Sequence, residues 1–482
     1  MKKLLVFWLA LTASGATLLE QRIDEIIRTA KALAPGAIGV EVIQLRSGKV
    51  LYSRNSDKLF TPASNTKLFS TGLALTRLGR DHRMTTRVYV PSGPGVDGQV
   101  PGDLVLFGGG DPSMSELVIP YEKGAALLDP MQSMETLADQ IVAHGVRTIH
   151  GNIVGDDSEW PWDPYPPGWA ADDSIWEYGA PVSALTFNCG VFHLSIRPGA
   201  AAGDPAMLTL NPPLEFFTIS NRIRTVTDGE QKIELDRPLG SRELRLWGTV
   251  KTGANEDLAV DDPALFAAAA LYDALARRGV SIDGGPVVRH REQGEAPRVP
   301  PGRQLVERPS PPLVELLKMV DKVSQNLWAE MMLREVARVR TGDGGRNAGL
   351  DELKAFLNEI GVPKEGYVFE DGSGLSRLTL VAPNVITRLL RFMYLSPNGA
   401  EWKTLLPIGA LDGSLTNRFN KNAAANAIAA KTGSLSHVNA LSGYTDSATY
   451  GEVAFSILVN HTNARAGEVR STIDKIALAL LE

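Results

Sequence analysis

The feature that most constrains the fold is a change of pattern along the chain. An amphipathic helix at 18–33, a hairpin at 38–52 and a helix that begins near Pro62 come first. Short strand-like runs with frequent Gly and Pro then fill the segment from about Thr85 to Pro312, after which helices return and three strand-like runs and a helix close the chain. Because apolar periods of about 3.6 and 2 residues predict helices and strands, the pattern predicts one α/β domain interrupted by a large, mainly β insertion.

Size and composition limit the classes of protein that remain. A chain of 482 residues is longer than one hydrophobic core usually supports, so two or three domains are expected. Hydrophobic residues make up 44% and charged residues 22%, which argues against a disordered or fibrous chain. The net charge of -6 gives no reason to expect a nucleic-acid partner. The Arg-, Glu- and Pro-rich segment 289–312 is predicted to be a linker.

The N-terminus has the order of a secretory signal peptide. Lys2 and Lys3 precede the apolar run 4–11, and small residues follow at 13–16. This run is too short to span a bilayer, and no later segment is long enough to do so. The cleavage region contains no cysteine, so no lipid anchor is expected there. We therefore expect residues 1–16 to be removed and the mature protein to be exported without a transmembrane anchor.

The sequence lacks the characteristic motifs of several kinds of metal, cofactor and hydrolase site. The single cysteine, Cys189, cannot form an intramolecular disulfide or a Cys-rich metal site, and is expected to be a small buried side chain. The seven histidines form no H-E-x-x-H motif, and no G-x-S-x-G elbow is present. The glycine-rich segment 371–374 has no Walker lysine and is predicted to be a turn. No metal and no cofactor are therefore predicted.

Ser64 and Lys67 form the first candidate pair, at the start of the helix that Pro62 opens. Residues three apart share one helix face, so the hydroxyl and the amine can meet. A serine needs a neighbouring base to become nucleophilic, and Lys67 can be that base if burial or another cation keeps its amine neutral. The pair predicts a nucleophile and its base, although S-x-x-K arises by chance about once or twice in a chain of this composition.

The segment Ser324-Gln325-Asn326 offers a second hydroxyl and an amide. The hydroxyl could relay a proton to the leaving group, and the amide could hold the substrate backbone or Lys67. The S-x-N pattern is weak by itself, because Ser53-Arg54-Asn55 and Ser396-Pro397-Asn398 also match it and are typical of turns, caps or exposed segments.

The segment Lys431-Thr432-Gly433-Ser434 ends the apolar strand 427–430. Its glycine permits close approach of a substrate backbone, and its lysine and hydroxyls suit a carboxylate. The backbone N–H of Ser434 could pair with that of Ser64 as an oxyanion hole. Lys251-Thr252-Gly253 also matches K-T-G, but only the triple of Ser64, Ser324 and Lys431 has the right order, each member in a suitable element.

With these motifs in this order, the chain resembles the class C low-molecular-mass penicillin-binding proteins, the D-alanyl-D-alanine carboxypeptidase/endopeptidase family of serine peptidases. The resemblance covers nearly the whole mature chain, and the long gap between Ser64 and Ser324 is part of it. The segments that carry it are 61–67, 324–330, 431–435, 109–112, 155–158, 178–185 and 371–376.

The resemblance implies a role for each candidate residue. Ser64 would be the acylated nucleophile, Lys67 the proton acceptor, and Ser324 and Asn326 would serve proton relay and substrate positioning. Lys431 would bind the substrate carboxylate and lower the pKa of Lys67.

Further substrate-binding residues follow from the same resemblance. Thr432, Gly433 and Ser434 would assist Lys431 at the strand. Asp156 matches an insertion-domain aspartate that lies near the active site in the family, and it is expected to contact the substrate.

The fold that the resemblance implies is a penicillin-binding/β-lactamase-like transpeptidase domain, an antiparallel sheet with helices, formed by residues 17–85 and 312–482. Two smaller domains would make up the insertion. One would contain 86–188 and 262–311, and the other, nested within it, would contain 189–261.

The implied activity is cleavage of D-alanyl-D-alanine ends or crosslinks in peptidoglycan peptides in the periplasm, with β-lactams such as penicillin as covalent inhibitors. Two alternatives stay open. One is a β-lactamase or esterase on the same fold, although class A β-lactamases have no insertion of this size between the first two motifs. The other is a non-catalytic penicillin-sensing or wall-binding protein, which the intact Lys67 and Lys431 disfavour.

Overall fold

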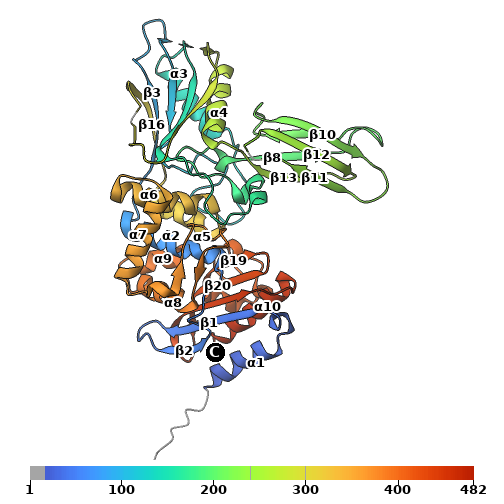
Figure 1. Ribbon diagram of the computed structural model, residues 1–482, viewed down its shortest axis with the longest axis vertical. Coiled ribbons are helices and arrows are strands. Elements are labelled where there is room, and N and C mark those ends of the chain that lie inside the picture. The colour runs from blue at the N-terminus through green and yellow to red at the C-terminus, as the bar shows by residue number, and fades with distance from the viewer. Residues whose placement is uncertain (1–16, 239, 299) are drawn as a thin grey trace, which may run out of the picture.

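The computed structural model describes residues 17–238, 240–298 and 300–482. The predicted signal peptide, residues 1–16, lies outside the described residues. The chain forms an elongated molecule in which its first and last segments pack together at one end, and the middle of the chain forms the other end (Figure 1). Within the described part of the chain, no helix has both the length and the apolar character needed to cross a bilayer.

A five-stranded antiparallel sheet joins the beginning and the end of the chain. Its strand order is β19 (Ala429–Leu435), β20 (Val438–Ser447), β21 (Gly451–Asn460), β1 (Ala37–Gln44) and β2 (Val50–Arg54). Strand β1 pairs with β21 along its whole length, from Ala37 opposite Asn460 to Gln44 opposite Val453. This long-range pairing builds one sheet from the two ends of the chain.

Side chains alternate between the two faces along each strand, and both faces of this sheet are covered and buried. Along β21, Val453, Phe455 and Ile457 pack in one apolar cluster with α1 (Leu18–Thr29) and α10 (Ala466–Ala479). Ala454 and Leu458 face the opposite side, in a second cluster that contains the helical layer. That layer comprises α2 (Lys67–Leu78), α5 (Leu313–Lys322), α6 (Asn326–Thr341), α7 (Arg346–Glu359), α8 (Pro383–Leu395) and α9 (Gly399–Leu405).

The insertion begins and ends in the same sheet. The order of this sheet is β15 (Pro286–Arg291), β7 (Ile153–Pro161), β5 (Leu104–Phe107), β3 (Thr85–Val90) and β16 (Arg303–Pro309). Its first strand, β3, pairs antiparallel with its last, β16, so that Thr85 lies opposite Pro309. The two ends of the insert therefore lie side by side, which is the condition for inserting one unit into another.

Helices and shorter strands complete this part of the insertion. Helix α4 (Pro263–Arg277) packs on β7 and β15, and α3 (Gln132–Ala143) packs on α4. A small sheet has the order β14 (Ser281–Ile282), β6 (Thr148–Ile149) and β4 (Gln99–Val100).

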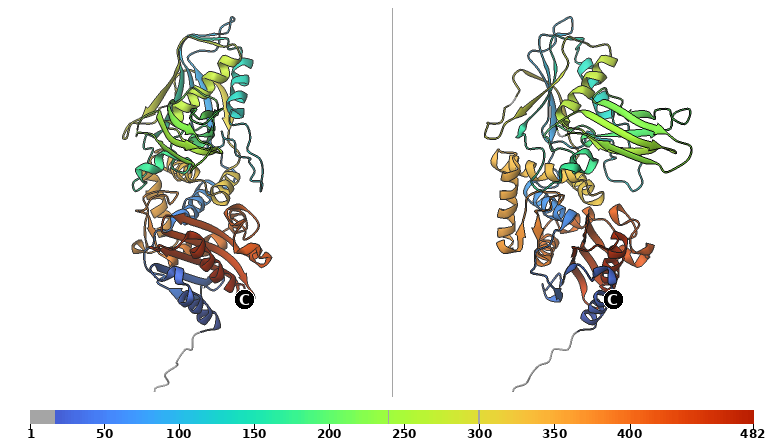
Figure 2. Two further views of the ribbon diagram at one scale, coloured as in Figure 1. Left: turned by 90° about the vertical axis from the view of Figure 1, so that its right-hand side faces the viewer. Right: turned by 45° about the vertical axis from the view of Figure 1, so that its right-hand side comes forward.

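A second group of strands projects sideways from the insertion (Figures 1 and 2). One three-stranded sheet contains β13 (Ala254–Ala259), β8 (Val191–Arg197) and β9 (Met207–Asn211). The other contains β10 (Thr218–Thr225), β12 (Glu243–Val250) and β11 (Lys232–Asp236). The predicted fold class, an α/β domain with an antiparallel sheet and a large insertion rich in strands, is confirmed.

Short elements join these units. They are η1 (Lys31–Leu33), η2 (Ala63–Thr66), η3 (Ala171–Ile175), η4 (Glu177–Gly179), η5 (Asn188–Gly190), η6 (Lys364–Gly366), η7 (Gly413–Leu415), η8 (Phe419–Lys421), η9 (Ala423–Ala427), β17 (Tyr367–Val368) and β18 (Leu380–Val381).

One prediction about the insertion is wrong. The segment 289–312 was expected to be a linker because of its Arg, Glu and Pro content. Its two ends, residues 289–291 and 303–309, instead belong to strands β15 and β16, which pair with β7 and β3. Both are the outer strands of their sheet, where Pro and charged residues are tolerated because one edge needs no backbone partner.

Candidate active site

Ser64 lies on a short 3-10 turn, η2, that leads directly into α2. Lys67 is the first residue of α2 and is fully buried, whereas Ser64 is partly exposed. The spacing of three residues places the Lys67 Nζ 2.9 Å from the Ser64 Oγ. The predicted contact between the hydroxyl and the amine is therefore present.

Lys67 has three polar partners. Besides Ser64, its Nζ lies 2.6 Å from Asn326 Oδ1 and 2.8 Å from the backbone oxygen of Ser373. Burial lowers the pKa of Lys67 well below its usual value, and the nearby charge of Lys431 lowers it further. The carboxylates of Asp371, Glu330 and Asp321 act in the opposite direction on that pKa. A lysine in this environment loses its proton more readily than an exposed lysine and can serve as a base.

Ser324 lies at a sharp break between α5 and α6. Helix α5 ends at Lys322 and α6 begins at Asn326, and Ser324 between them has a φ of 67°, in the left-handed region. This break points the Ser324 hydroxyl at Lys431, whose Nζ donates to it at 2.9 Å. Asn326, the first residue of α6, reaches Lys67 with its amide oxygen and donates its amide N–H to the backbone oxygen of Tyr178 at 2.8 Å.

Lys431 is buried on β19, the outermost strand of the five-stranded sheet. Burial lowers its pKa to about 8, while the neighbouring Asp321 carboxylate acts to raise that pKa. The backbone oxygen of Lys431 accepts from the Asn65 amide at 3.0 Å, which ties the strand to the residue after Ser64. The two lysines therefore lie in one buried cluster but on different elements.

Gly433 allows β19 to pass close to the nucleophile turn. A Cβ at this position would lie 2.7 Å from the Pro62 oxygen and 3.2 Å from the Ala63 Cβ. Only a glycine avoids both contacts. Thr432 faces Ser414, with 2.8 Å between their hydroxyl oxygens, and Ser434 is exposed at the mouth of the site.

A cavity of about 410 Å³ opens at Ser64. Asn326 and Ser434 also line it, together with Gly374, Leu375 and Arg377 of a loop from the catalytic end of the molecule. Leu435 and Ser436 complete this side, and the insertion supplies another part of the wall, with Ala170, Asp172, Asp173 and Tyr178. The structure thus brings one residue of each motif, Ser64, Asn326 and Ser434, to one open pocket, and the insertion forms part of its wall.

Asp156 requires a correction. It lies in the middle of β7, almost fully buried, and its carboxylate binds Arg289 Nη1 at 2.9 Å and the Ser158 amide at 3.0 Å. It does not line the pocket at Ser64. Its carboxylate is satisfied inside the insertion sheet, so the structure does not support the expected contact with substrate.

The acidic residues at the pocket are Asp172 and Asp173 instead. Sequence reasoning missed them because no spacing links this pair to any of the three motifs. The only local signal is their place shortly before the segment 178–185, which carries part of the family resemblance.

The fold and the site together define a serine acyl-transfer enzyme of the penicillin-binding, β-lactamase-like class. The chain belongs to the D-Ala-D-Ala carboxypeptidase 3 (S13) family, whose model matches residues 19–480. It is 34% identical over 491 residues to a D-alanyl-D-alanine carboxypeptidase from Actinomadura sp. (strain R39), a match that covers 98% of this chain and 86% of that protein.

More distant matches include a curated carboxypeptidase and a solved structure. The chain is 22% identical over 462 residues to the D-alanyl-D-alanine carboxypeptidase DacB of Haemophilus influenzae, covering 92% of this chain and 89% of that protein. Its fold is similar to the crystal structure of penicillin binding protein 4 (dacB) from Haemophilus influenzae, with a TM-score of 0.82 at 20% identity, over 95% of this chain and 99% of the other.

Proposed function

We propose that this protein is a serine D-alanyl-D-alanine carboxypeptidase that also cleaves crosslinks as an endopeptidase, through an acyl-enzyme on Ser64. The observation that carries the proposal is the 2.9 Å contact between Ser64 Oγ and the buried Lys67 amine at the base of an open cavity. Membership of the carboxypeptidase family and the D-alanyl-D-alanine carboxypeptidases among its relatives support the substrate class.

The contacts of Ser64 and Ser324 with the two buried lysines support the following acylation step. Lys67, as the neutral amine, takes the proton of Ser64 while the Oγ attacks the carbonyl between the two D-residues. The backbone N–H groups of Ser64 and Ser434 would stabilise the oxyanion. The C–N bond of the tetrahedral intermediate then breaks, and Ser324, whose hydroxyl is held by Lys431, would relay the proton that Lys67 took to the leaving amine. Water then hydrolyses the acyl-enzyme and returns Ser64.

Substrate binding follows from the charges at the cavity. Lys431, with Thr432 and the open edge of β19, would bind the terminal carboxylate and the extended peptide backbone. Asp172 and Asp173 of the insertion and Arg377 of the catalytic end give the cavity wall both signs of charge. A stem peptide that carries both amino and carboxylate groups suits this wall, whereas a purely apolar ligand does not.

The wider assignments belong to the same proposal. Peptidoglycan peptides would be the substrates and β-lactams covalent inhibitors, because a β-lactam leaving group stays tethered at the site. A solved relative, penicillin binding protein 4 of Haemophilus influenzae, has been crystallised in complex with a β-lactam. Export to the periplasm rests on the signal-like residues 1–16.

The domain limits are likewise proposed. Residues 17–85 and 312–482 would form the peptidase domain, and 86–188 with 262–311 the first insertion domain. The projecting strands would form a nested domain at 189–261. The adjacent ends of β3 and β16 support the outer boundary, and the pairing of Val191 with Ala259 supports the inner one.

Release of D-alanine from a pentapeptide that ends in D-alanyl-D-alanine tests the function. The purified mature protein should release D-alanine, and Ser64→Ala should release none. Ser53→Ala is the matched control, because Ser53 is exposed and belongs to a second S-x-N match. Absence of release by the wild-type protein, or fast turnover of penicillin instead of a lasting adduct, would contradict the proposal.

A further inference from the structure

The loop 371–376 packs against both members of the catalytic pair. Its Ser373 oxygen accepts from Lys67 Nζ, and its Gly372 oxygen accepts from the Ser70 hydroxyl at 2.8 Å. A Cβ at Gly374 would lie 1.9 Å from the Ala63 oxygen, so the loop touches the turn that carries Ser64. The position of this loop therefore sets part of the environment of the Lys67 amine.

Two fully buried carboxylates hold the loop by its backbone amides. Glu330 Oε1 accepts from the amides of Gly372 and Ser373 at 2.9 and 2.8 Å. Asp371 Oδ2 accepts from the amides of Gly374 and Ser376 at 3.0 and 2.9 Å. With these four amides directed at carboxylates, the loop oxygens at 372 and 373 are left to face α2.

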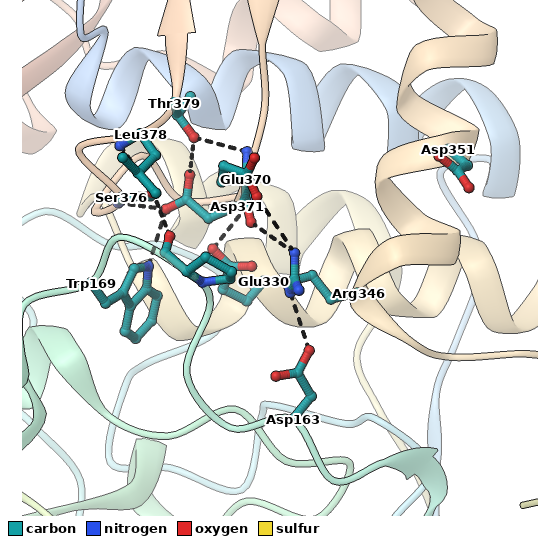
Figure 3. A network of polar contacts seen from close by, with 12 residues as sticks. Asp163, Trp169, Glu330, Arg346, Asp351, Glu370, Asp371, Ser376, Leu378 and Thr379 are labelled. Atoms are coloured by element: carbon teal, nitrogen blue, oxygen red, sulfur yellow. Dashed lines mark hydrogen bonds and ion pairs between the residues drawn. The ribbon is translucent and has the colours of Figure 1, made fainter. Parts of the chain in front are cut away.

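Asp371 also connects the loop to its surroundings. Its second oxygen accepts from the Thr379 hydroxyl at 2.8 Å, and Trp169 Nε1 donates to Oδ2 at 3.2 Å. Figure 3 shows Asp371 between Thr379 and Trp169, with Glu330 beside it on α6. Trp169 precedes the pocket-lining Ala170, so the same carboxylate is bound to the wall that the insertion supplies.

The direction of the Lys67 lone pair follows from its three partners. A neutral amine has two N–H donors and one lone pair. Asn326 Oδ1 and the Ser373 oxygen can only accept, so they take the two N–H groups. The third contact, at Ser64 Oγ, is then left for the lone pair, which must point there to take the serine proton.

We propose that Asp371 and Glu330 are positioning residues for acylation, which fix the Ser373 oxygen and thereby aim the Lys67 lone pair at Ser64. This inference rests on the proposed function, because it assumes that Ser64 is the acylated serine. Neither carboxylate touches the substrate in this account. Both act through the backbone of one loop.

The charges around Lys67 give the inference its distinguishing measurement. The groups that act on Lys67 are Lys431 on β19, Glu330 on α6, Asp321 on α5 and Asp371 in the loop. The last three raise the pKa of Lys67, so removing the charge of Asp371 or Glu330 lowers it. The base is active only when neutral, and the acid limb of the acylation profile therefore moves to lower pH.

The test uses Asp371→Asn and Glu330→Gln in the full chain, with a fluorescent penicillin mixed rapidly at a series of pH values. Each variant should acylate about tenfold or more slowly on the plateau, because the base is misdirected, with unchanged non-covalent affinity. The acid limb should lie at lower pH than in the wild type. Asp111→Asn is the control, since Asp111 is a buried carboxylate that binds the Ser113 amide and Arg308 in the insertion.

Wild-type rate and pH dependence in folded variants would overturn the inference. A slower rate with an unmoved acid limb would also overturn it, because loosened structure alone produces that result. If Asp371→Asn does not fold, Glu330→Gln decides by the same criteria. A wild-type protein that is never labelled would instead sink the proposed function itself.

Discussion

At the residue scale, two lysine amines of similar burial have different surroundings. Lys67 lies against a hydroxyl and two oxygens that only accept, which suits a neutral base. Lys431 lies beside Ser324 and near the Asp321 carboxylate, which favours its cation. These surroundings support the proposal that Lys67 is the base and Lys431 the charged binding group.

Replacing the base tests this separation first. Lys67→Met keeps the length of the side chain but removes the amine, and acylation by penicillin should slow by about 10²–10⁴-fold, the usual contribution of a positioned base. Lys354→Met is the control, because Lys354 is exposed and pairs with Asp351 on the surface. A variant that acylates within a few-fold of the wild type would show that another group removes the serine proton.

The pH dependence of KM tests the role of Lys431. Its pKa of about 8 lies below the usual value, so the amine is charged below that pH and loses its charge above it. The KM for a substrate with a free terminal carboxylate should therefore rise as pH increases through about 8. In Lys431→Arg the guanidinium stays charged and the rise should be absent. A KM that is constant across this range in the wild type would contradict the assigned role.

At the scale of elements, the site depends on close passage of β19 past the nucleophile turn. Gly433 makes this passage possible, and the Asn65 side chain secures it. Asn460 fixes the approach to the turn from β21, since its side chain bonds both the N–H and the oxygen of Thr61, at 2.7 and 3.1 Å.

A methyl group at Gly433 should separate β19 from the turn that carries Ser64. In Gly433→Ala the new Cβ would meet the Pro62 oxygen, so β19 must shift away from Ser64. We expect acylation to slow by more than about tenfold and the free energy of unfolding to fall by about 1–3 kcal/mol. Gly285→Ala is the control, because nothing lies within 4 Å of its added Cβ. Unchanged acylation kinetics would show that β19 does not need this approach.

Local patterns predicted the elements that carry the three motifs but not their fine geometry. The helix near Pro62 and the strand before Lys431 follow from periodicity and from the residues at their ends. The 3-10 turn at Ala63–Thr66 and the left-handed Ser324 do not, because packing against β19 and Lys431 determines them.

The same limit explains the two errors. Strands β15 and β16 are stabilised by pairing with distant β7 and β3, which the composition of 289–312 does not reveal. Asp156 and the pair Asp172 and Asp173 are all acidic residues of the insertion, and only the fold decides which of them reaches the pocket.

At the scale of the whole molecule, the insertion packs against the helices of the catalytic end and shares an apolar cluster with them. Trp160 of β7 is almost fully buried in the same apolar cluster as α2, α5 and α6. Gly344, between α6 and α7, packs directly on the indole ring. Tyr178 in turn binds Asn326 through its backbone oxygen.

Alanine substitutions of two tryptophans in the insertion should therefore differ in their effects on stability and on acylation. Trp160→Ala should lower the free energy of unfolding by about 3–5 kcal/mol and slow acylation as well, because it opens a cavity between insertion and helices. Trp247→Ala should change stability by no more than about 0.5 kcal/mol, since Trp247 is 43% exposed on the projecting sheet. Thermal unfolding and penicillin labelling of both variants check this. A mild effect of Trp160→Ala would indicate that the two parts unfold independently.

The central claim is that folding gathers Ser64, Lys67, Ser324, Asn326 and Lys431 around one carbonyl that Ser64 attacks. Mass spectrometry of the penicillin-treated protein, with the modified residue located by peptide mapping, tests it most directly. We predict one penicilloyl group on Ser64 and none on Ser64→Ala. An adduct on another residue, or an adduct that persists in Ser64→Ala, would contradict the account.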